Sequence, residues 1–337
     1  MKRKLTASCK RISGTLMLPV TMYLVMMLLC YSNGKMYYGT VKMWRTLIVD
    51  IAVSITCAMG IGLQFRSGRF DFSGGAIMLL SGIIAGNIAV QAGNNLLLMC
   101  ILCIVCCWVF SMFVALFYVY SRVPIMITTI GFALLYESIT CLVFHGTGIN
   151  IISNMTLRVF STYPMVLLPL FGAIGLYAFY CYLTTSGKQA VLLANNQEAA
   201  VHIGINEQKN VLVSYTFSGL IFGFATIIWI AGGKHDAAYT SMATVNELFS
   251  NILPVFIGLM VSGFCGDTIG TIVGSVTLCL MSYALKAVFS NTLGSAISNI
   301  CMGVFILIIN VASAQGRNLL KNIGKMLKHD WRRKTHG

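Results

Sequence analysis

Apolar residues along the chain gather into ten stretches of about 20 residues, with shorter polar segments between them. A helix needs roughly 20 predominantly apolar residues to cross the hydrocarbon core of a bilayer. The pattern therefore predicts an all-α, polytopic transmembrane helix bundle of about ten spans. The third and eighth stretches are short and contain glycine, so a broken or re-entrant segment is the alternative for each. The predicted spans cover residues 13–30, 46–63, 74–90, 96–120, 124–144, 164–183, 211–231, 248–264, 268–289 and 296–313.

The composition indicates that lipid is the solvent for most of the chain. Of the 337 residues, 57% are hydrophobic and only 9% are charged, and the mean hydropathy is +0.82. A soluble domain carries about 25% charged residues, because its surface has to be covered by polar groups. This arithmetic excludes soluble domains, a disordered chain and a nucleic-acid-binding domain.

Lysine and arginine predict the orientation of the chain. Most of the 23 basic residues lie before the first span, in alternate loops, and after the last span. Basic residues are enriched in cytoplasmic segments, so we expect both termini in the cytoplasm of a bacterial-type cell membrane. The predicted organisation is a basic N-terminus (1–12), one transmembrane domain (13–313) with a long inner loop (184–210), and a basic tail (314–337). The tail is expected to lie on anionic lipid, so the net charge of +14 requires no nucleic acid.

Catalytic and cofactor motifs are missing from the sequence. It contains no H-E-x-x-H, G-x-S-x-G, G-x-G-x-x-G or Walker A pattern. None of the five histidines has a second ligand at metal spacing, and most of the 12 cysteines lie in apolar stretches, where cysteine is usually a small hydrophobe. We expect a transport component and not an enzyme, with no catalytic residue and with no metal or cofactor bound by this chain.

Three ionisable residues lie inside predicted spans. Glu137 is thirteen residues into its span, where a charge costs about 2.5–3.5 kcal/mol on insertion scales. Glu137 either lines a translocation path or is a buried structural acid bonded to Ser or Thr, such as Thr140. Asp50 and Lys286 lie nearer the outer ends of their spans, where we expect a solvated acid and a snorkelling lysine.

Uncharged polar residues also occur in the third, ninth and tenth spans. We expect some of them, in particular Asn87, Ser275 and Asn299, to line a path for a polar solute, and others to bond between helices. A short internal repeat points in the same direction, because paired glycine-containing segments mark the transport site of many carriers. Its two copies are Ile61-Gly62-Leu63, Ser67-Gly68 and Asp71, and Ile257-Gly258-Leu259, Ser262-Gly263 and Asp267.

The inner loop 184–210 contains a predicted short helix. Asn196 is a favourable N-cap, Glu198 in the first turn complements the helix dipole, and Gly204 can end the helix as a C-cap. The helix would have about two turns, with Ala199 and Ala200 on its surface. Such small residues permit insertion into the groove of a partner, whereas the plain alternative is an amphipathic linker.

Several motifs together resemble the permeases of simple-sugar (ribose-type) ATP-binding-cassette (ABC) importers, whose superfamily also holds branched-chain amino-acid permeases. The matches follow the order of the family and cover roughly residues 45–315. They are Ser67-Gly68-Arg69-Phe70-Asp71-Phe72-Ser73-Gly74-Gly75, Val123-Pro124 before Ile125–Gly131, Ala194-Asn195-Asn196-Gln197-Glu198-Ala199-Ala200 with Gly204-Ile205, Phe217-Ser218-Gly219 with Gly223, and Gly266 with Gly270-Thr271-Ile272-Val273-Gly274.

The resemblance implies partners and roles. Two permease chains, identical or related, would form the pathway, and a cytoplasmic ABC ATPase would supply ATP and magnesium. An extracytoplasmic solute-binding protein would deliver the solute. The resemblance places Asp71, Ser73 and Gly74 at the translocation path or gate. It also implies a loop that couples the permease to the ATPase, formed by Asn195, Asn196, Gln197, Glu198, Ala199, Ala200 and Gly204.

The chain departs from the family at two places. Arg69 stands where glycine is usual, and Phe264-Cys265-Gly266-Asp267 replaces a more glycine-rich segment. Asp71 favours the sugar branch, because the amino-acid branch usually carries asparagine there. The alternatives are a branched-chain amino-acid or nucleoside ABC permease, a proton-coupled secondary transporter with Glu137 as the carrier, and a membrane enzyme or scaffold.

Overall fold

The computed structural model describes residues 2–261, 265–289, 294, 296–305 and 307. The longer helices are α1 (Lys2–Ser32), α2 (Val41–Arg66), α3 (Gly74–Gln91), α4 (Leu96–Ser121), α5 (Ile125–Leu142), α6 (Leu167–Ala178), α7 (Thr185–Asn195), α9 (Glu207–Ala231), α10 (Val245–Val261) and α11 (Asp267–Val288). The shorter elements are α8 (Gln197–His202), the 3₁₀ turns η1 (Val143–Gly146) and η2 (Val159–Ser161), the π-helical turn η3 (Phe179–Leu183), and the strands β1 (Ile149–Asn150) and β2 (Lys234–His235).

The all-α transmembrane fold is confirmed. In the described part of the chain, seven helices are long and apolar enough to span a bilayer, and a bent pair, Leu167–Leu183 with Thr185–Asn195, gives an eighth. Two shorter apolar helices, Glu247–Val261 and Ala296–Phe305, correspond to the described parts of the eighth and tenth predicted stretches. The third stretch is a complete helix of 18 residues, α3. The predicted tail, 314–337, lies outside the described residues.

The inner loop is more helical than predicted. The sequence predicts one short helix beginning after Asn196, but α7 precedes it, and α9 begins at Glu207 instead of residue 211. Thr184 starts α7 because its hydroxyl accepts a hydrogen bond from the Gly187 amide at 3.0 Å. The axis bends by 71° between η3 and α7. A polar helix after such a bend has no apolar pattern to reveal it.

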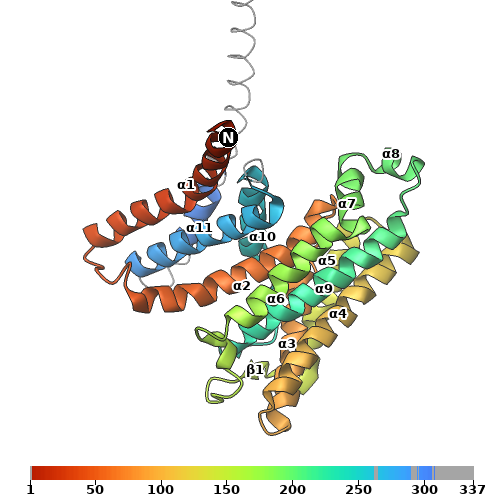
Figure 1. Ribbon diagram of the computed structural model, residues 1–337. Coiled ribbons are helices and arrows are strands. Elements are labelled where there is room, and N and C mark those ends of the chain that lie inside the picture. Colours follow the sequence, from red (N-terminus) through yellow and green to blue (C-terminus); the bar gives the residue numbers. More distant parts are fainter. Residues whose placement is uncertain (1, 262–264, 290–293, 295, 306, 308–337) are drawn as a thin grey trace, which may run out of the picture.

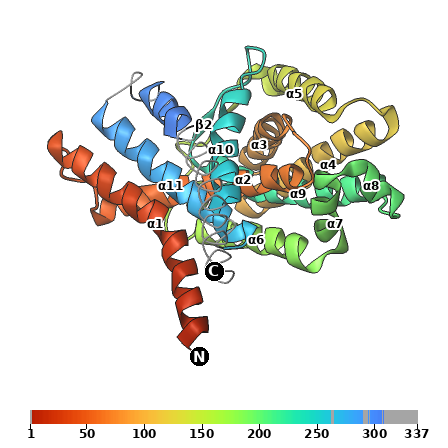
Figure 2. The ribbon, with the colours of Figure 1, turned by 90° about the horizontal axis from the view of Figure 1, so that it is seen from above.

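The helices form two groups that meet at α2 (Figures 1 and 2). Helices α3, α4, α5, α6 and α9 pack together, with α9 against α4 and α6. Helices α1, α10 and α11 form the other group. Helix α2 contacts α9 and α6 on one side and α10 and α11 on the other. Any space between α2, α9, α10 and α11 is therefore walled by both groups.

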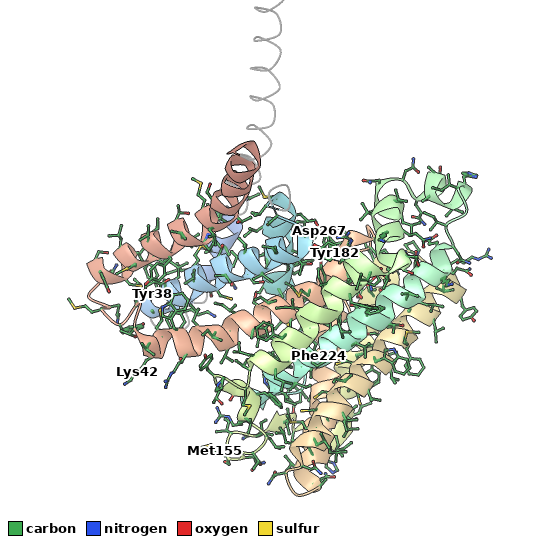
Figure 3. All side chains as sticks on the ribbon, in the orientation of Figure 1. Tyr38, Lys42, Met155, Tyr182, Phe224 and Asp267 are labelled. Atoms are coloured by element: carbon green, nitrogen blue, oxygen red, sulfur yellow. The ribbon has the colours of Figure 1, made fainter. Side chains whose placement is uncertain are left out.

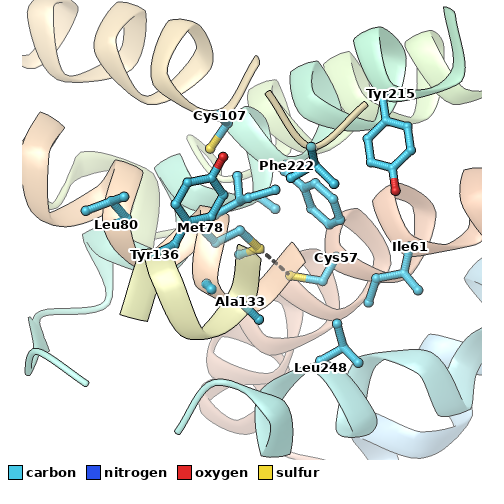
Figure 4. Close-up of a cluster of buried hydrophobic side chains, with 14 of the residues drawn as sticks. Cys57, Ile61, Met78, Leu80, Cys107, Ala133, Tyr136, Tyr215, Phe222 and Leu248 are labelled. Atoms are coloured by element: carbon cyan, nitrogen blue, oxygen red, sulfur yellow. Dashed lines mark hydrogen bonds between the residues drawn. The ribbon is translucent and has the colours of Figure 1, made fainter. Parts of the chain in front are cut away.

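Buried side chains from six helices, α2, α3, α4, α5, α9 and α10, form one core cluster. Figure 4 shows Cys57 of α2 and Met78 of α3 with their sulfur atoms 3.7 Å apart, and the ring of Phe222 beside them. Phe222 fills the space between helices, since a Cβ added to Gly60 would lie 2.6 Å from its ring. Tyr215 and Leu248 extend the same cluster.

Helices α10 and α11 approach each other without an intervening side chain. A Cβ added to Gly270 would lie 2.5 Å from the carbonyl oxygen of Gly258, and one added to Gly274 would lie 2.4 Å from that of Pro254. Small residues permit such close packing of membrane helices. These helices form the second copy of the internal repeat, of which Ser262 and Gly263 lie outside the described residues.

The larger helix group has two ends. The α8 end carries α7, α8 and the turn 67–73 between α2 and α3. The β-ribbon end carries β1 and β2, which pair antiparallel, with Ile149 opposite His235. In Figure 1, α8 and β1 lie at opposite extremes of the larger helix group. Figure 3 shows Asp267 and Tyr182 close together towards the α8 end and Met155 at the other.

Candidate functional site

The turn 67–73 brings together three of the predicted gate residues. Asp71 is 4% exposed, and its Oδ1 accepts hydrogen bonds from the Ser73 amide at 2.7 Å and the Ser73 hydroxyl at 2.6 Å. Gly74 begins α3 directly against Phe222, whose ring atom Cζ would lie 2.7 Å from an added Cβ. Asp71, Ser73 and Gly74 therefore form one buried corner at the α8 end.

The two oxygens of the Asp71 carboxyl are held unequally. Its Oδ2 has no hydrogen-bond partner among the residues that the structure describes. Burial raises the pKa of Asp71 above its usual value, and the hydrogen bonds from Ser73 act in the opposite direction. The Tyr215 hydroxyl also interacts with this carboxyl. The corner therefore holds a carboxyl whose pKa lies above that of a solvated aspartate.

The loop residues around α8 lie mainly on the surface. Asn196 caps α8 as predicted, because its Oδ1 accepts a hydrogen bond from the Ala199 amide at 3.0 Å. Ala199 is exposed, but Ala200 is 3% exposed and packs with Leu193 and Ile205. The prediction of surface alanines is thus right for Ala199 and wrong for Ala200, which anchors α8 to α7.

The other loop positions complete this surface. Gln197 donates a hydrogen bond from Nε2 to Glu207 Oε1 at 2.8 Å and so ties α8 to α9. Gly204 follows α8 with φ +92°, a conformation that favours glycine. Asn195 and Glu198 are exposed beside it. A partner at the α8 end would therefore meet Asn195, Glu198 and Ala199.

Glu137 is held by the segment that precedes α10. Its Oε2 accepts a hydrogen bond from the Met242 amide at 2.7 Å, and its Oε1 accepts two from Thr244, from the amide at 2.8 Å and from the hydroxyl at 2.6 Å. Thr140 instead donates to the Glu137 backbone carbonyl at 2.6 Å. These contacts favour the interpretation of Glu137 as a buried structural acid. Its carboxylate is bonded by the hydroxyl of Thr244 instead of that of Thr140.

The uncharged residues predicted along a path do not come together. Asn87 bonds through Nδ2 to the carbonyl oxygens of Ile83 and Gly148, both at 2.9 Å, and so ties α3 to the β-ribbon end. Ser275 is fully buried in α11, and no partner for its hydroxyl is found in the described part of the chain. Asn299 is exposed on the short helix Ala296–Phe305.

A pocket of about 430 Å³, termed the four-helix pocket, lies where α2, α9, α10 and α11 meet. Sites for small molecules typically have about 300–1,000 Å³. Its polar side chains recur every three or four residues along α2, α10 and α11, which places them on one face of each helix. These polar residues are Asp50, Ser54, Glu247, Asn251, Ser282 and Lys286.

Three of the four charged side chains of the four-helix pocket lack an ion-pair partner among the described residues, whereas the fourth, Lys234, is paired. Across the described ranges, the ion pairs are Arg66 with Asp267 and Lys234 with Asp236. Asp50, Glu247 and Lys286 therefore face the pocket without an ion-pair partner. From the sequence, Asp50 and Lys286 are expected to be separate interfacial groups, whereas the fold places both at one cavity.

Aromatic groups stand at the same pocket. Trp229 and His235 lie with ring centroids 3.8 Å apart, and His235 Nε2 is 3.0 Å from the Trp229 carbonyl oxygen. Burial lowers the pKa of His235, so its imidazole is neutral near pH 7. Tyr283 of α11 also lines the pocket. An aromatic face beside carboxylate and amide groups suits a solute with both apolar and hydroxylated faces.

The pocket continues into a second hollow of about 450 Å³ with Asp50 in both linings. Arg45 and Arg158 line this hollow. Arg158 is held by the carbonyl oxygens of Ala231, at 3.4 Å from Nε, and Ile152, at 3.2 Å from Nη1. In the same described ranges, no three His, Cys, Asp or Glu side chains gather in a way that could hold a metal ion.

Sequence reasoning missed Glu247 and Asn251 as pocket residues. The available signal was the spacing of polar residues within apolar stretches, Asp50 with Ser54 and Glu247 with Asn251, each four apart. That spacing marks a polar stripe on a helix but does not reveal which stripes face one another.

Comparison with known proteins identifies the family. The family described as branched-chain amino acid transport system, permease component, matches residues 43–310. The galactose/methyl galactoside import permease MglC of Escherichia coli K12 is 25% identical over 269 residues, covering 73% of this chain and 79% of MglC. The ribose import permease RbsC of the same strain is 23% identical over 257 residues, covering 74% and 79%.

A third relative covers more of the chain. The inner membrane ABC transporter permease YjfF of E. coli K12 is 23% identical over 317 residues, which is 90% of this chain and 93% of YjfF. The matched region contains both the four-helix pocket and the loop around α8. The chain thus belongs to the branched-chain amino-acid transport permease family, whose members are non-catalytic, multi-pass membrane subunits of ABC importers.

Proposed function

We propose that the chain forms the translocation path for a monosaccharide or a related sugar in an ATP-driven importer. The observation that carries this proposal is the four-helix pocket, in which unpaired carboxylates, an amide and a lysine stand beside Trp229. Hydroxyl groups of a sugar both donate and accept hydrogen bonds, so one solute could engage Asp50, Asn251 and Lys286. The relatives MglC, a galactose/methyl galactoside import permease, and RbsC, a ribose import permease, support the same solute class.

The α8 end would face the cytoplasm and bind the ATPase. This assignment follows the charge bias of the loops and the exposed positions of Glu198 and Ala199 beside the N-terminus of α8. The sequence lacks a Walker A motif, so ATP and magnesium would be held by that partner. A second permease chain and an extracytoplasmic solute-binding protein would complete the importer in the cell membrane.

A branched-chain amino acid is the second candidate solute. The description of the matched family favours it, and so does the presence of both Asp50 and Lys286 in the pocket, because a zwitterion could pair with both. The proton-coupled alternative has less support. Both carboxylate oxygens of Glu137 are engaged by amide and hydroxyl donors, which leaves this carboxylate poorly placed to carry protons.

The test is uptake by proteoliposomes that contain the chain with its co-purified ATPase and solute-binding protein. Labelled galactose, ribose, leucine and uridine are supplied separately, with ATP or with a proton gradient. We expect ATP-dependent uptake of one of the two sugars. Uptake of leucine alone would establish the amino-acid alternative, and uptake driven by the proton gradient without ATP would overturn the importer assignment.

A further inference from the structure

The turn 67–73 contains a buried arginine, Arg69. Arg69 is 5% exposed, and its guanidinium donates hydrogen bonds to Ser214 Oγ at 3.3 Å and to Asn210 Oδ1 at 3.4 Å. Neither of the ion pairs found in the described part of the chain involves Arg69. Burying a charge among neutral groups costs free energy, and burial lowers the pKa of Arg69. We therefore expect Arg69 to have a function that offsets this cost.

Asn210 extends the contact of Arg69 to the neighbouring helix α7. Its Oδ1 accepts from Arg69, and its Nδ2 donates to the carbonyl oxygen of Ser186 at 2.8 Å. Asn210 is 1% exposed and lies in the first turn of α9, directly after the α8 loop. One amide therefore joins the turn 67–73, α7 and α9.

The same turn also touches α7 through its backbone. Gly68 adopts φ +74°, and a Cβ there would lie 3.1 Å from the Cα of Ala194 in the last turn of α7. A side chain at position 68 would collide with α7, so the backbones of the turn and of α7 lie close together. A displacement of α7 towards the turn would thus have to move the turn with it.

The turn is joined to both walls of the four-helix pocket. It directly follows α2, on which Asp50 lies sixteen residues before Arg66, a distance of about 24 Å along the helix. Arg66 forms an ion pair with Asp267, the first residue of α11. Helix α11 carries Ser282 and Lys286 at the pocket. The turn 67–73 is therefore placed to move α2 and α11 together.

We propose that Arg69 is a positioning residue that transmits displacement of α7 and α8 to α2 and α11, and so changes access to the four-helix pocket. The proposal rests on the ATP-driven function proposed above. Arg69 acts through Asn210 and Ser186 on one side and through the turn 67–73 on the other. Its contribution is to make a turn and two helices move as one body.

The experiment follows access to the pocket in the permease–ATPase complex in lipid nanodiscs. Glu247→Cys places a thiol in the pocket wall, and its labelling by a membrane-impermeant maleimide is quantified by peptide mass spectrometry. Labelling rates are compared without nucleotide and with ATP plus vanadate. Allosteric couplings typically correspond to changes of about 5–150-fold, so we expect the rates in the Glu247→Cys background to differ at least about fivefold.

In that background, Arg69→Met is expected to bring the ratio of the two rates close to one. The ATPase should still co-purify, and its binding separates lost transmission from lost assembly. Lys209→Met is the matched control, since it removes an exposed cation beside Asn210, and it should keep the ratio. A ratio in Arg69→Met equal to that of the control would overturn the proposal.

Two further variants apply where Arg69→Met does not fold. Arg69→Lys keeps the charge but lacks the fork that reaches two acceptors. Asn210→Asp keeps an acceptor for Arg69 and removes the donor to Ser186. Both are expected to reduce the ratio, and a full ratio in both would refute the role of Arg69. If the two labelling rates are equal in Glu247→Cys with Arg69 intact, the result would instead contradict the ATP-driven function itself, and with it this proposal.

Discussion

Two buried carboxyl groups, Glu137 of α5 and Asp71 of the turn 67–73, are held in contrasting ways. Glu137 receives three hydrogen bonds of 2.6–2.8 Å from Met242 and Thr244, which engage both of its oxygens. Asp71 receives two hydrogen bonds from Ser73, both at one oxygen. The first arrangement fixes the start of α10 against α5, whereas the second leaves one oxygen unbonded in a turn that would have to move.

The two carboxyl groups therefore have different structural roles. The hydrogen bonds from Met242 and Thr244 to Glu137, termed the clamp, fix the wall of the four-helix pocket that carries Glu247 and Asn251. The turn around Asp71 joins α7 to α2 and is placed to transmit movement. Stability would then depend mainly on the hydrogen bonds to Glu137 and motion on the turn 67–73, and the following substitutions test that separation.

Glu137→Ala is expected to have the largest effect on folding. It leaves two backbone amides and the Thr244 hydroxyl without an acceptor, at about 1–3 kcal/mol for each unsatisfied buried group. We expect a loss of about 3 kcal/mol in the free energy of unfolding, measured by equilibrium denaturation in mixed micelles with sodium dodecyl sulfate.

Thr140→Val is the control variant for that measurement. Thr140 lies one turn from Glu137 and accepts a hydrogen bond from the Ala238 amide at 2.9 Å, so its loss should cost about 1 kcal/mol. Equal losses of unfolding free energy in Glu137→Ala and Thr140→Val would show that the three hydrogen bonds to Glu137 stabilise the fold no more than the single one to Thr140.

Gly74→Ala tests the packing of the Asp71 corner and should have the next largest effect. The added methyl group would lie 2.7 Å from the Phe222 ring, and overpacking of this kind costs about 1–3 kcal/mol. The same denaturation measurement applies. The double variant Gly74→Ala with Phe222→Leu should regain part of the loss, and a simple sum of the two losses would speak against the contact.

Asn196→Ala should act locally at the α8 end. Loss of an N-cap costs about 1 kcal/mol, and here the cap is the hydrogen bond to the Ala199 amide. We expect faster hydrogen exchange in residues 197–202, with exchange in α5 and α10 unchanged, as followed by mass spectrometry. Accelerated exchange across the whole chain would contradict a local role of the Asn196 cap.

Asp71→Asn should have the smallest effect on stability and a distinct dependence on pH. The folded pKa of Asp71 is raised, so the folded state binds more protons than the unfolded state between the two pKa values. The wild type should therefore lose stability as pH rises from about 4 through the folded pKa. An amide side chain cannot ionise, so the variant should lack this part of the pH dependence.

Thermal unfolding between pH 4 and pH 8 measures the difference between the wild type and Asp71→Asn. The variant should be at least as stable as the wild type at pH 7, while its side-chain oxygen still accepts from Ser73. If Asp71→Asn is less stable than the wild type and this difference grows with pH, Asp71 is held as a charged group, as in an ion pair.

The sequence was sufficient for the helices because span length and apolar composition are local properties. Thr184 shows the limit, since its cap starts α7 after a bend that no apolar pattern marks. Asn196 and Gly204 could be assigned because capping depends on neighbouring residues. Ala200 was misassigned because its burial depends on Leu193 and Ile205.

The pocket could not be predicted in the same way. Asp50, Glu247 and Lys286 lie on three helices, and their shared cavity results from the packing of α10 and α11 against α2. Glu137 was equally open to two readings, because its donors at Met242 and Thr244 come from a segment far along the chain. Tertiary packing decides which polar residues of a membrane protein face a cavity.

The most direct test of this account is the initial rate of ATP-driven uptake by Asp50→Asn, compared with Asn299→Ala. Asp50 lines the four-helix pocket, whereas Asn299 is exposed on the short helix Ala296–Phe305. The account predicts at least about a tenfold lower rate for Asp50→Asn, as for a lost hydrogen bond to a charged group, with unchanged binding of the ATPase. Asn299→Ala should transport at the wild-type rate. Wild-type uptake by Asp50→Asn would contradict the assignment of the four-helix pocket to the solute path.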